Sequence, residues 1–144
     1  MKTKTCCFTG HRALSEEARI SLRPALLRHI QTLVEGGYRH FLCGGASGFD
    51  SFAADLVLEF KAQVTDIELV LVLPYQKQVP HPLESQADRC LVLSDHYFRG
   101  CFHVRNRAMV DLSSACICYC RHEKSGTAST LQAAKKAGLL ILEL

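Results

Sequence analysis

The sequence has no tryptophan and only a small excess of positive charge. Its 144 residues carry 17 Lys and Arg against 14 Asp and Glu, a formal net charge of +3 at pH 7. Proteins dedicated to nucleic acids usually have a stronger basic excess, and single-strand binders add aromatic rings on which bases stack. The Phe and Tyr residues here fall mostly in apolar segments that are expected to be core. A nucleic-acid partner is therefore disfavoured.

Long hydrophobic runs are also missing. No window of 18 residues is free of polar side chains, so we expect no membrane span and no membrane partner. The first residues, Met1 to Lys4, lead into a β-like run that is too short for the core of a signal peptide. We expect a cytoplasmic protein and, at this length, a single domain over residues 1–144.

The sequence has eight cysteines but no CxxC pair. Zinc sites commonly take such pairs from turns, whereas seven of these thiols lie in or beside apolar β-like segments. Cys116, Cys118 and Cys120 alternate along one segment, so they share one face. Cysteine in such places serves as a small hydrophobic residue. We expect buried free thiols and no metal site.

Six short apolar segments are typical of buried parallel strands. They are Thr5–Thr9, His40–Cys43, Leu69–Leu73, Cys90–Leu93, Ala115–Cys120 and Leu139–Leu142. Helical patterns separate most of them, at about 15–35, Asp50–Ala62, Val104–Leu112 and Thr127–Lys136. Pro24 lies inside the first helix and is expected to kink or divide it. The alternation predicts an α/β fold with a mostly parallel sheet of about six strands and helices on both faces.

Ligands bind to such sheets beyond the carboxyl ends of the strands. The segments expected there are Gly10-His11-Arg12, Gly44 to Asp50, Pro74-Tyr75-Gln76, Arg105-Asn106 and Lys124 to Thr127. Neither the G-x-G-x-x-G fingerprint nor the G-x-x-x-x-G-K-[ST] pattern occurs, which argues against a conventional NAD enzyme and a P-loop protein.

The loop "GGASGFD" combines three glycines with Asp50 at the start of a helix. Its amides, from Gly44 to Gly48, are expected to hold phosphate, as are those of Ser125 to Thr127. Arg12 and Arg105 would add positive charge. A carboxylate repels phosphate, so Asp50 is expected to face a ribose hydroxyl, a base donor, an arginine or its own helix.

Four motifs, "TGHR", "GGASGFDSFAAD", "VRNRAMVD" and "SGTAST", together resemble the SLOG superfamily and, within it, the YpsA-like branch. The resemblance runs from about residue 5 to residue 142. It implies a Rossmann-like three-layer αβα sandwich that binds nucleotides or nucleotide-derived ligands. Members often pair through helices, which makes a homodimer an expectation. The loop 74–88 is shorter than in YpsA-like proteins, and Tyr75 and Gln76 are its best candidates for ligand contact.

Two other families frame the alternatives. "FHVRN" and "SGTAST" resemble motifs of the Lonely Guy phosphoribohydrolases, at His103, Arg105, Gly126 and Thr127. The glutamate of that family falls on Thr130 here, and a threonine cannot supply the charge that N-glycosidic cleavage needs. "GGASGFDSFAA" and the first loop resemble the DNA-processing protein A (Smf) family, which binds single-stranded DNA.

We expect a sensor or signalling module that binds a nucleotide or nucleotide-derived small molecule, such as an NAD-derived ligand, and that requires no cofactor. The alternatives are a nucleotide N-glycosidase with Arg105 and Asp50 as catalytic candidates, and an Smf-like single-stranded DNA-binding protein. The expected ligand-binding residues are Gly10, His11, Arg12, Gly44, Gly45, Ser47, Gly48, Asp50, Tyr75, Gln76, Arg105, Asn106, Ser125, Gly126, Thr127 and Thr130.

Overall fold

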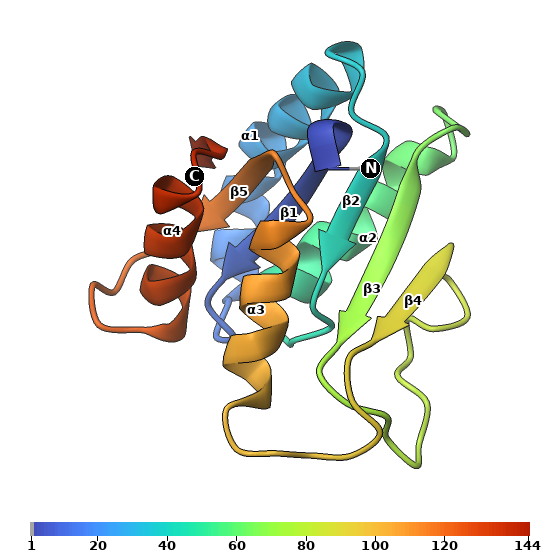
Figure 1. The fold of residues 1–144 in the computed structure, drawn as a ribbon. Coiled ribbons are helices and arrows are strands. Elements are labelled where there is room, and N and C mark those ends of the chain that lie inside the picture. The colour runs from blue at the N-terminus through green and yellow to red at the C-terminus, as the bar shows by residue number, and fades with distance from the viewer. Residues whose placement is uncertain (1) are drawn as a thin grey trace.

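The chain folds around a six-stranded sheet in which every neighbouring pair of strands is parallel, in the order β4-β3-β2-β1-β5-β6 (Figure 1). The computed structural model describes residues 2–144. The strands are β1 (Thr5–Gly10), β2 (His40–Cys43), β3 (Glu68–Leu73), β4 (Arg89–Val92), β5 (Ala115–Tyr119) and β6 (Leu140–Glu143). The helices are η1, a 3-10 helix (Lys2–Lys4), α1 (Glu16–Glu35), α2 (Phe49–Lys61), α3 (Cys101–Asp111) and α4 (Gly126–Lys136).

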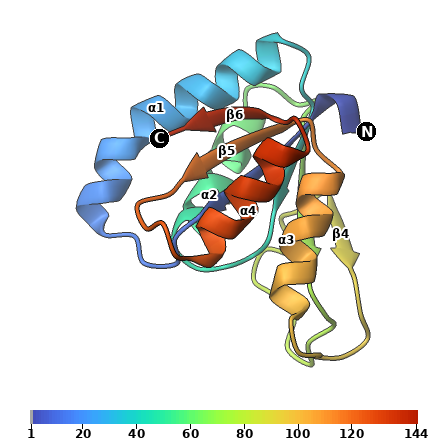
Figure 2. The same cartoon turned by 60° about the vertical axis from the view of Figure 1, so that its left-hand side comes forward.

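Helices cover both faces of the sheet, which gives the expected three-layer αβα sandwich. Helices α1 and α2 pack on one face, and α3 and α4 pack on the other (Figures 1 and 2). Each face has its own apolar cluster. In β1 the side chain of Cys6 joins the cluster under α1 and α2, while that of Cys7 joins the cluster under α3 and α4. Because the sheet is buried on both sides, its strands are continuous apolar runs, as the sequence predicted.

The order of the strands places a crevice at the carboxyl end of β1. From β1 the chain moves outward through β2, β3 and β4, and α3 then carries it back to β5 on the other side of β1. This reversal is a topological switch point, where the loops of neighbouring strands separate and leave room for a ligand. The five segments that were predicted to lie at the ligand edge converge on this end of the sheet.

The helices differ from the sequence prediction in two places. The sequence predicted that Pro24 kinks or divides the first helix, and a division is wrong, because α1 runs unbroken from Glu16 to Glu35 with Pro24 on its exposed side. Helix α3 begins at Cys101, earlier than the predicted Val104, so Phe102 and His103 belong to its first turn. In residues 2–144 no helix is both long enough and apolar enough to cross a membrane.

The cysteines are free thiols, but they are not all buried. Cys90 is exposed on the edge strand β4, and Cys120 is half-buried beyond the end of β5. The expectation of burial is therefore wrong for these two residues and right for the other six. A residue on an edge strand or just beyond the end of a strand is covered by neighbours on one side only. The apolar pattern of the sequence does not show which strands lie at the edge.

We predict that Pro24→Ala stabilises the protein. The substitution supplies a backbone N–H that can donate to the carbonyl of Ile20, and Pro24 is exposed, so no packing is lost. An interior proline costs about 3 kcal/mol, and the greater freedom of the unfolded chain takes back about 1 kcal/mol. The free energy of unfolding in urea should rise by about 1–2 kcal/mol. Arg28→Ala, on the exposed side of the same helix, is the control and should stay within about 0.5 kcal/mol.

Candidate functional site

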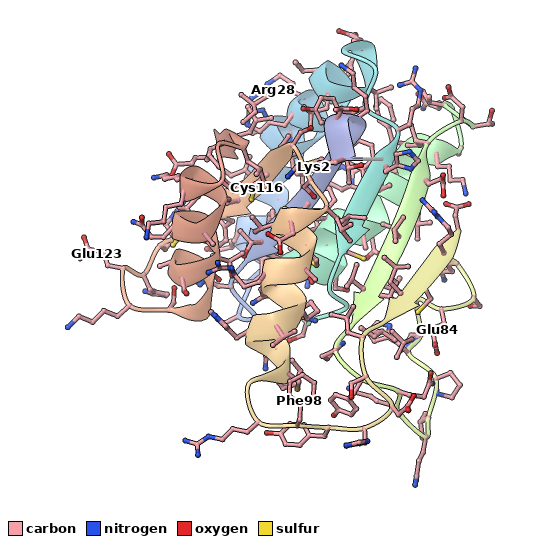
Figure 3. All side chains as sticks on the ribbon, in the orientation of Figure 1. Lys2, Arg28, Glu84, Phe98, Cys116 and Glu123 are labelled. Atoms are coloured by element: carbon pink, nitrogen blue, oxygen red, sulfur yellow. The ribbon has the colours of Figure 1, made fainter. Side chains whose placement is uncertain are left out.

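A cavity of about 340 Å³ lies at the carboxyl end of β1, between α3 and the start of α4. In Figure 3 the labelled Phe98 and Glu123 mark the segments that lead into α3 and α4 at this end of the molecule. We call this the first cavity. Nine of the expected residues line it: Gly10, His11, Arg12, Asp50, Arg105, Asn106, Ser125, Gly126 and Thr127. Phe8, Thr9, Ala46, Phe102, His103 and Met109 complete its wall.

A second cavity, of about 200 Å³, adjoins the first on the side of β2 and β3. Arg12, Ala46, Phe102 and Arg105 line both cavities. The expected residues Gly44, Gly45 and Ser47 line only the second. The rest of its wall consists of Leu73, Pro74, Lys77 and His81. The predicted binding edge thus consists of two neighbouring compartments that share part of their wall.

Four expected residues line neither cavity, and each has another role. Gly48 precedes α2 with a φ of 75°, and a Cβ there would lie 2.2 Å from the carbonyl oxygen of Arg12. Gln76 donates its backbone N–H to the carbonyl of Ser94. The buried hydroxyl of Thr130 donates to the carbonyl of Gly126 within α4. Tyr75 packs edge-on against the rings of Tyr97 and Phe102.

The glycine-rich loop already holds an anion, the carboxylate of Asp50. Its Oδ2 accepts the backbone N–H of Gly44 at 2.8 Å and that of Ala46 at 3.3 Å, and the side chain is almost wholly buried. The prediction that the amides from Gly44 to Gly48 hold phosphate is therefore wrong for these two amides. Asp50 neither caps its own helix nor repels a phosphate within the loop, because it occupies the phosphate's expected place.

Burial dominates the electrostatics of Asp50 and raises the pKa of its carboxyl group above the ordinary value of 3.8. The guanidinium of Arg105 opposes this increase first, followed by the two loop amides and Arg12. The pKa of Arg105 is shifted in the opposite direction, downward. Burial lowers the pKa of its guanidinium, the charge of Asp50 raises it, and the nearby Arg12 lowers it again.

Arg105 projects from α3 into the wall between the two cavities and is only 5% exposed. Its Nη1 donates to the carbonyl of Gly44 at 2.5 Å, and its Nε donates to Oδ1 of Asn106 at 2.8 Å. A Cβ on Gly44 would lie 2.7 Å from Nη1, so only glycine admits this approach. Two of the five N–H groups of the guanidinium are used in this way. These two hydrogen bonds fix the guanidinium, and its remaining N–H groups lie at the wall that the two cavities share.

A second guanidinium, that of Arg12, also lines both cavities. Its Cζ is 5.3 Å from the centre of the Phe102 ring, and the Cζ of Arg105 is 5.7 Å from it. In the described part of the chain, neither group has a carboxylate oxygen within 4.0 Å. Two cations thus share one aromatic ring without a direct ion pair.

The start of α4 forms the opposite wall of the first cavity. Ser125 caps the helix, with its Oγ accepting the N–H of Ala128 at 3.1 Å and donating to the carbonyl of His122 at 2.9 Å. The hydroxyl of Ser125 is therefore engaged in the cap. The amides of the first turn and the buried side chain of Thr127 remain at the cavity wall, where the positive end of the helix dipole favours an anion.

His11 ties the first loop to the loop before α4. The backbone N–H of Arg121 donates to Nε2 of His11 at 2.7 Å, and the imidazoles of His11 and His122 lie 4.6 Å apart, measured between ring centres. The lone pair of Nε2 must be free to accept this bond, so the ring is neutral with its proton on Nδ1. Partial burial, followed by the charges of His122 and Arg121, lowers the pKa of His11 from its ordinary value of 6.5.

Sequence reasoning missed part of the wall, above all Phe102, Lys77 and His81. Phe102 was placed before the helix rather than in its first turn, where it lies three residues before Arg105 on the same face. The expectation that aromatic residues are mostly core is also wrong at this edge. Tyr97 is 59% exposed and Phe102 is 38% exposed. Among residues 2–144, no three His, Cys, Asp or Glu side chains are grouped so that they could hold a metal ion.

Comparison with known sequences gives one family. A sequence model of the YspA SLOG family matches residues 6–138. The chain is 25% identical over 130 residues to UPF0398 proteins of Bacillus anthracis (strain A0248) and Bacillus cereus (strain B4264). Each match covers 81% of this chain and 71% of the relative.

Comparison with solved structures gives a shared fold. DNA processing protein A (DprA) from Streptococcus pneumoniae matches with a TM-score of 0.70 and 19% sequence identity, over 98% of this chain and 50% of that one. DNA processing protein A from Helicobacter pylori, which binds single-stranded DNA, matches with a TM-score of 0.67 and 20% identity. That match covers 96% of this chain and 64% of the other. This chain therefore spans half of the first structure and less than two thirds of the second.

We predict that Asp50→Ala costs about 3–5 kcal/mol of unfolding free energy, because it leaves two loop amides and a buried guanidinium without their acceptor and counter-charge. Asp50→Asn should cost only about 1–2 kcal/mol, since the amide oxygen of Asn can still accept both N–H groups. Urea denaturation of both variants measures the difference. Equal losses would show that the hydrogen bonds to Gly44 and Ala46 do not matter for stability.

A second prediction concerns pH and His11. Because the pKa of His11 is lowered, the unfolded chain takes up the proton at a higher pH than the native protein does. The stability that depends on neutral His11 is therefore present above 6.5 and is lost as the pH falls below it. Relative to His11→Gln, the wild type should lose unfolding free energy between about pH 7.5 and 5.5. A His11→Gln protein with the wild-type slope would contradict the assignment.

Proposed function

The chain belongs to the YspA SLOG family, as its four motifs predicted, and on that premise we propose that the two cavities bind a nucleotide or nucleotide-derived small molecule. The protein would act as a sensor or signalling module, with the bound molecule as its signal. The single observation that carries this proposal is the pair of guanidinium groups on Phe102. Arg12 and Arg105 lie 5.3 and 5.7 Å from that ring, at the wall of a cavity of about 340 Å³.

The phosphate is best accommodated between these arginines and the start of α4. Arginine N–H groups and the amides of a helix start are both donors to phosphate oxygens. The loop Gly44 to Ala46 is less suited to this role, because its amides already bind Asp50. Three of the four motifs would thus contact the phosphate: "TGHR" through Arg12, "VRNRAMVD" through Arg105, and "SGTAST" through the start of α4. The fourth motif, "GGASGFDSFAAD", would hold Arg105 in place through the carbonyl of Gly44.

Asp50 is consequently proposed as a positioning residue for the loop and for Arg105. Its Oδ2 is engaged, which leaves Oδ1 for a ribose or base donor at the cavity wall. This arrangement weakens the alternative of a nucleotide N-glycosidase. Cleavage of that kind needs a carboxylate that can meet a developing positive centre or activate water, and burial with two N–H donors holds this one in place.

Single-stranded DNA binding is the second candidate, and one observation favours it. Tyr75, Tyr97 and Phe102 form a chain of edge-to-face contacts at the surface, and Lys77 lies 5.8 Å from the centre of the Tyr75 ring. Aromatic rings interleaved with cations are the usual platform for unpaired bases. The fold is also that of the Helicobacter pylori protein that binds single-stranded DNA.

We predict that Arg12→Met lowers the affinity for nucleoside monophosphates and diphosphates about tenfold or more, because it removes a charged donor from the phosphate site. The melting temperature of the free protein should barely change, since Arg12 is exposed. Isothermal titration with a panel of nucleotides measures the affinity. Arg99→Met removes an exposed arginine that lines neither cavity, and it should bind as the wild type does.

Further measurements separate the three functions. Incubation with the same panel should release no free base, and release that is lost in Asp50→Asn would establish the hydrolase instead. A single-stranded oligonucleotide of about 20 bases should bind no more tightly than its constituent nucleotides. Tight oligonucleotide binding that falls in Tyr97→Ala would establish the DNA-binding function. No binding of any nucleotide would overturn the proposal.

A further inference from the structure

The second cavity carries a strong charge of one sign. Three of its lining residues are cations, Arg12, Lys77 and Arg105, and no acidic residue among the described residues lines it. The buried Asp50 lines the first cavity only. Like charges that converge on a small hollow repel one another, and the repulsion is relieved when an anion enters. The charge pattern thus distinguishes this cavity from the first.

The imidazole of His81 does not add to this charge. Its Nδ1 accepts the backbone N–H of Leu83 at 3.0 Å, so the proton of the neutral ring is on Nε2. Nε2 then donates to the carbonyl of Gly45 at 2.7 Å. Nε2 thus fastens the loop 74–88 to the glycine loop, and the bond at Nδ1 holds the imidazole within its own loop. His81 therefore shapes the cavity, and the three Arg and Lys side chains supply its charge.

The two cavities share part of their wall. Arg12, Phe102 and Arg105 line both, so the same guanidinium groups face a molecule in either cavity. Arginine can donate in two directions from its planar group. An anionic group in the second cavity therefore faces the same two arginines as one in the first, and it also faces Lys77.

We propose that the second cavity is a subsite for a further phosphate of the same ligand. The ligand class is then a nucleotide with a diphosphate, free or bridging to another group, rather than a nucleoside monophosphate. This inference rests on the proposed function, because it assumes that the first phosphate binds at the start of α4. Lys77 is the residue that selects for the additional phosphate, since it lines only the second cavity.

The test compares AMP with ADP, GMP with GDP, and orthophosphate with pyrophosphate, by isothermal titration of the full chain. The wild type should bind the diphosphate of each pair at least tenfold more tightly. Lys77→Met should lower this ratio about fivefold or more. Lys136→Met, which removes an exposed lysine at the end of α4 that lines neither cavity, is the matched control and should keep the wild-type ratio.

A second variant introduces negative charge into the same place. Ser47 is exposed and lines only the second cavity, so Ser47→Asp should lower the ratio as Lys77→Met does. Equal binding of monophosphates and diphosphates, unchanged in both variants, would overturn the subsite and leave the proposed function standing. Selective pyrophosphate binding that depends on Lys77, without any nucleotide binding, would support the subsite and overturn the proposed function. The absence of all binding would overturn both.

Discussion

The buried carboxylate of Asp50 organises the carboxyl end of the sheet. It accepts two amides of the glycine loop, and its charge faces Arg105, whose guanidinium in turn donates to the carbonyl of Gly44. Loop, α2 and α3 are therefore joined by one small polar cluster. A buried charge is tolerated only when its hydrogen bonds and counter-charge are in place. The geometry of both cavities depends on this condition, because Arg105 lines both of them.

In this cluster the glycine-rich loop has a structural role that differs from the predicted phosphate binding. A glycine-rich turn before a helix is often read as a cradle for phosphate. Here the glycine at position 44 serves the close approach of Arg105, and two amides of the turn bind an internal anion. The helix start that remains available lies across the cavity, at α4. The first turn of α4 thus remains at the cavity wall, whereas the loop before α2 binds Asp50 and, through the carbonyl of Gly44, the guanidinium of Arg105.

Much of the fold could be predicted from the sequence, because strands buried on both faces leave a simple apolar pattern and their βα loops must meet at one end. The same principle correctly predicted that Gly10, Arg12, Asp50 and Arg105 lie close together. An arginine was among the partners expected for Asp50, but the amides of Gly44 and Ala46 were not, because an acidic residue at a helix start is also the usual cap of that helix. The contacts of Thr130 with Gly126 and of Tyr75 with Tyr97 and Phe102 were not predicted either. A hydroxyl in a helix and a ring in a loop have several available partners, and only packing selects one.

The charges around the first cavity give a final constraint on its ligand. Arg12 and Arg105 contribute two positive charges, and an ionised Asp50 cancels one of them. The start of α4 adds the equivalent of about half a positive charge. The sum, about +1.5, is close to the charge of about −1.5 to −2 that a phosphate monoester carries near neutral pH. One phosphate of the proposed ligand would therefore balance the charge of the first cavity. A second phosphate would be compensated in the second cavity, where Lys77 adds a charge that no acidic residue of the described cavity wall offsets.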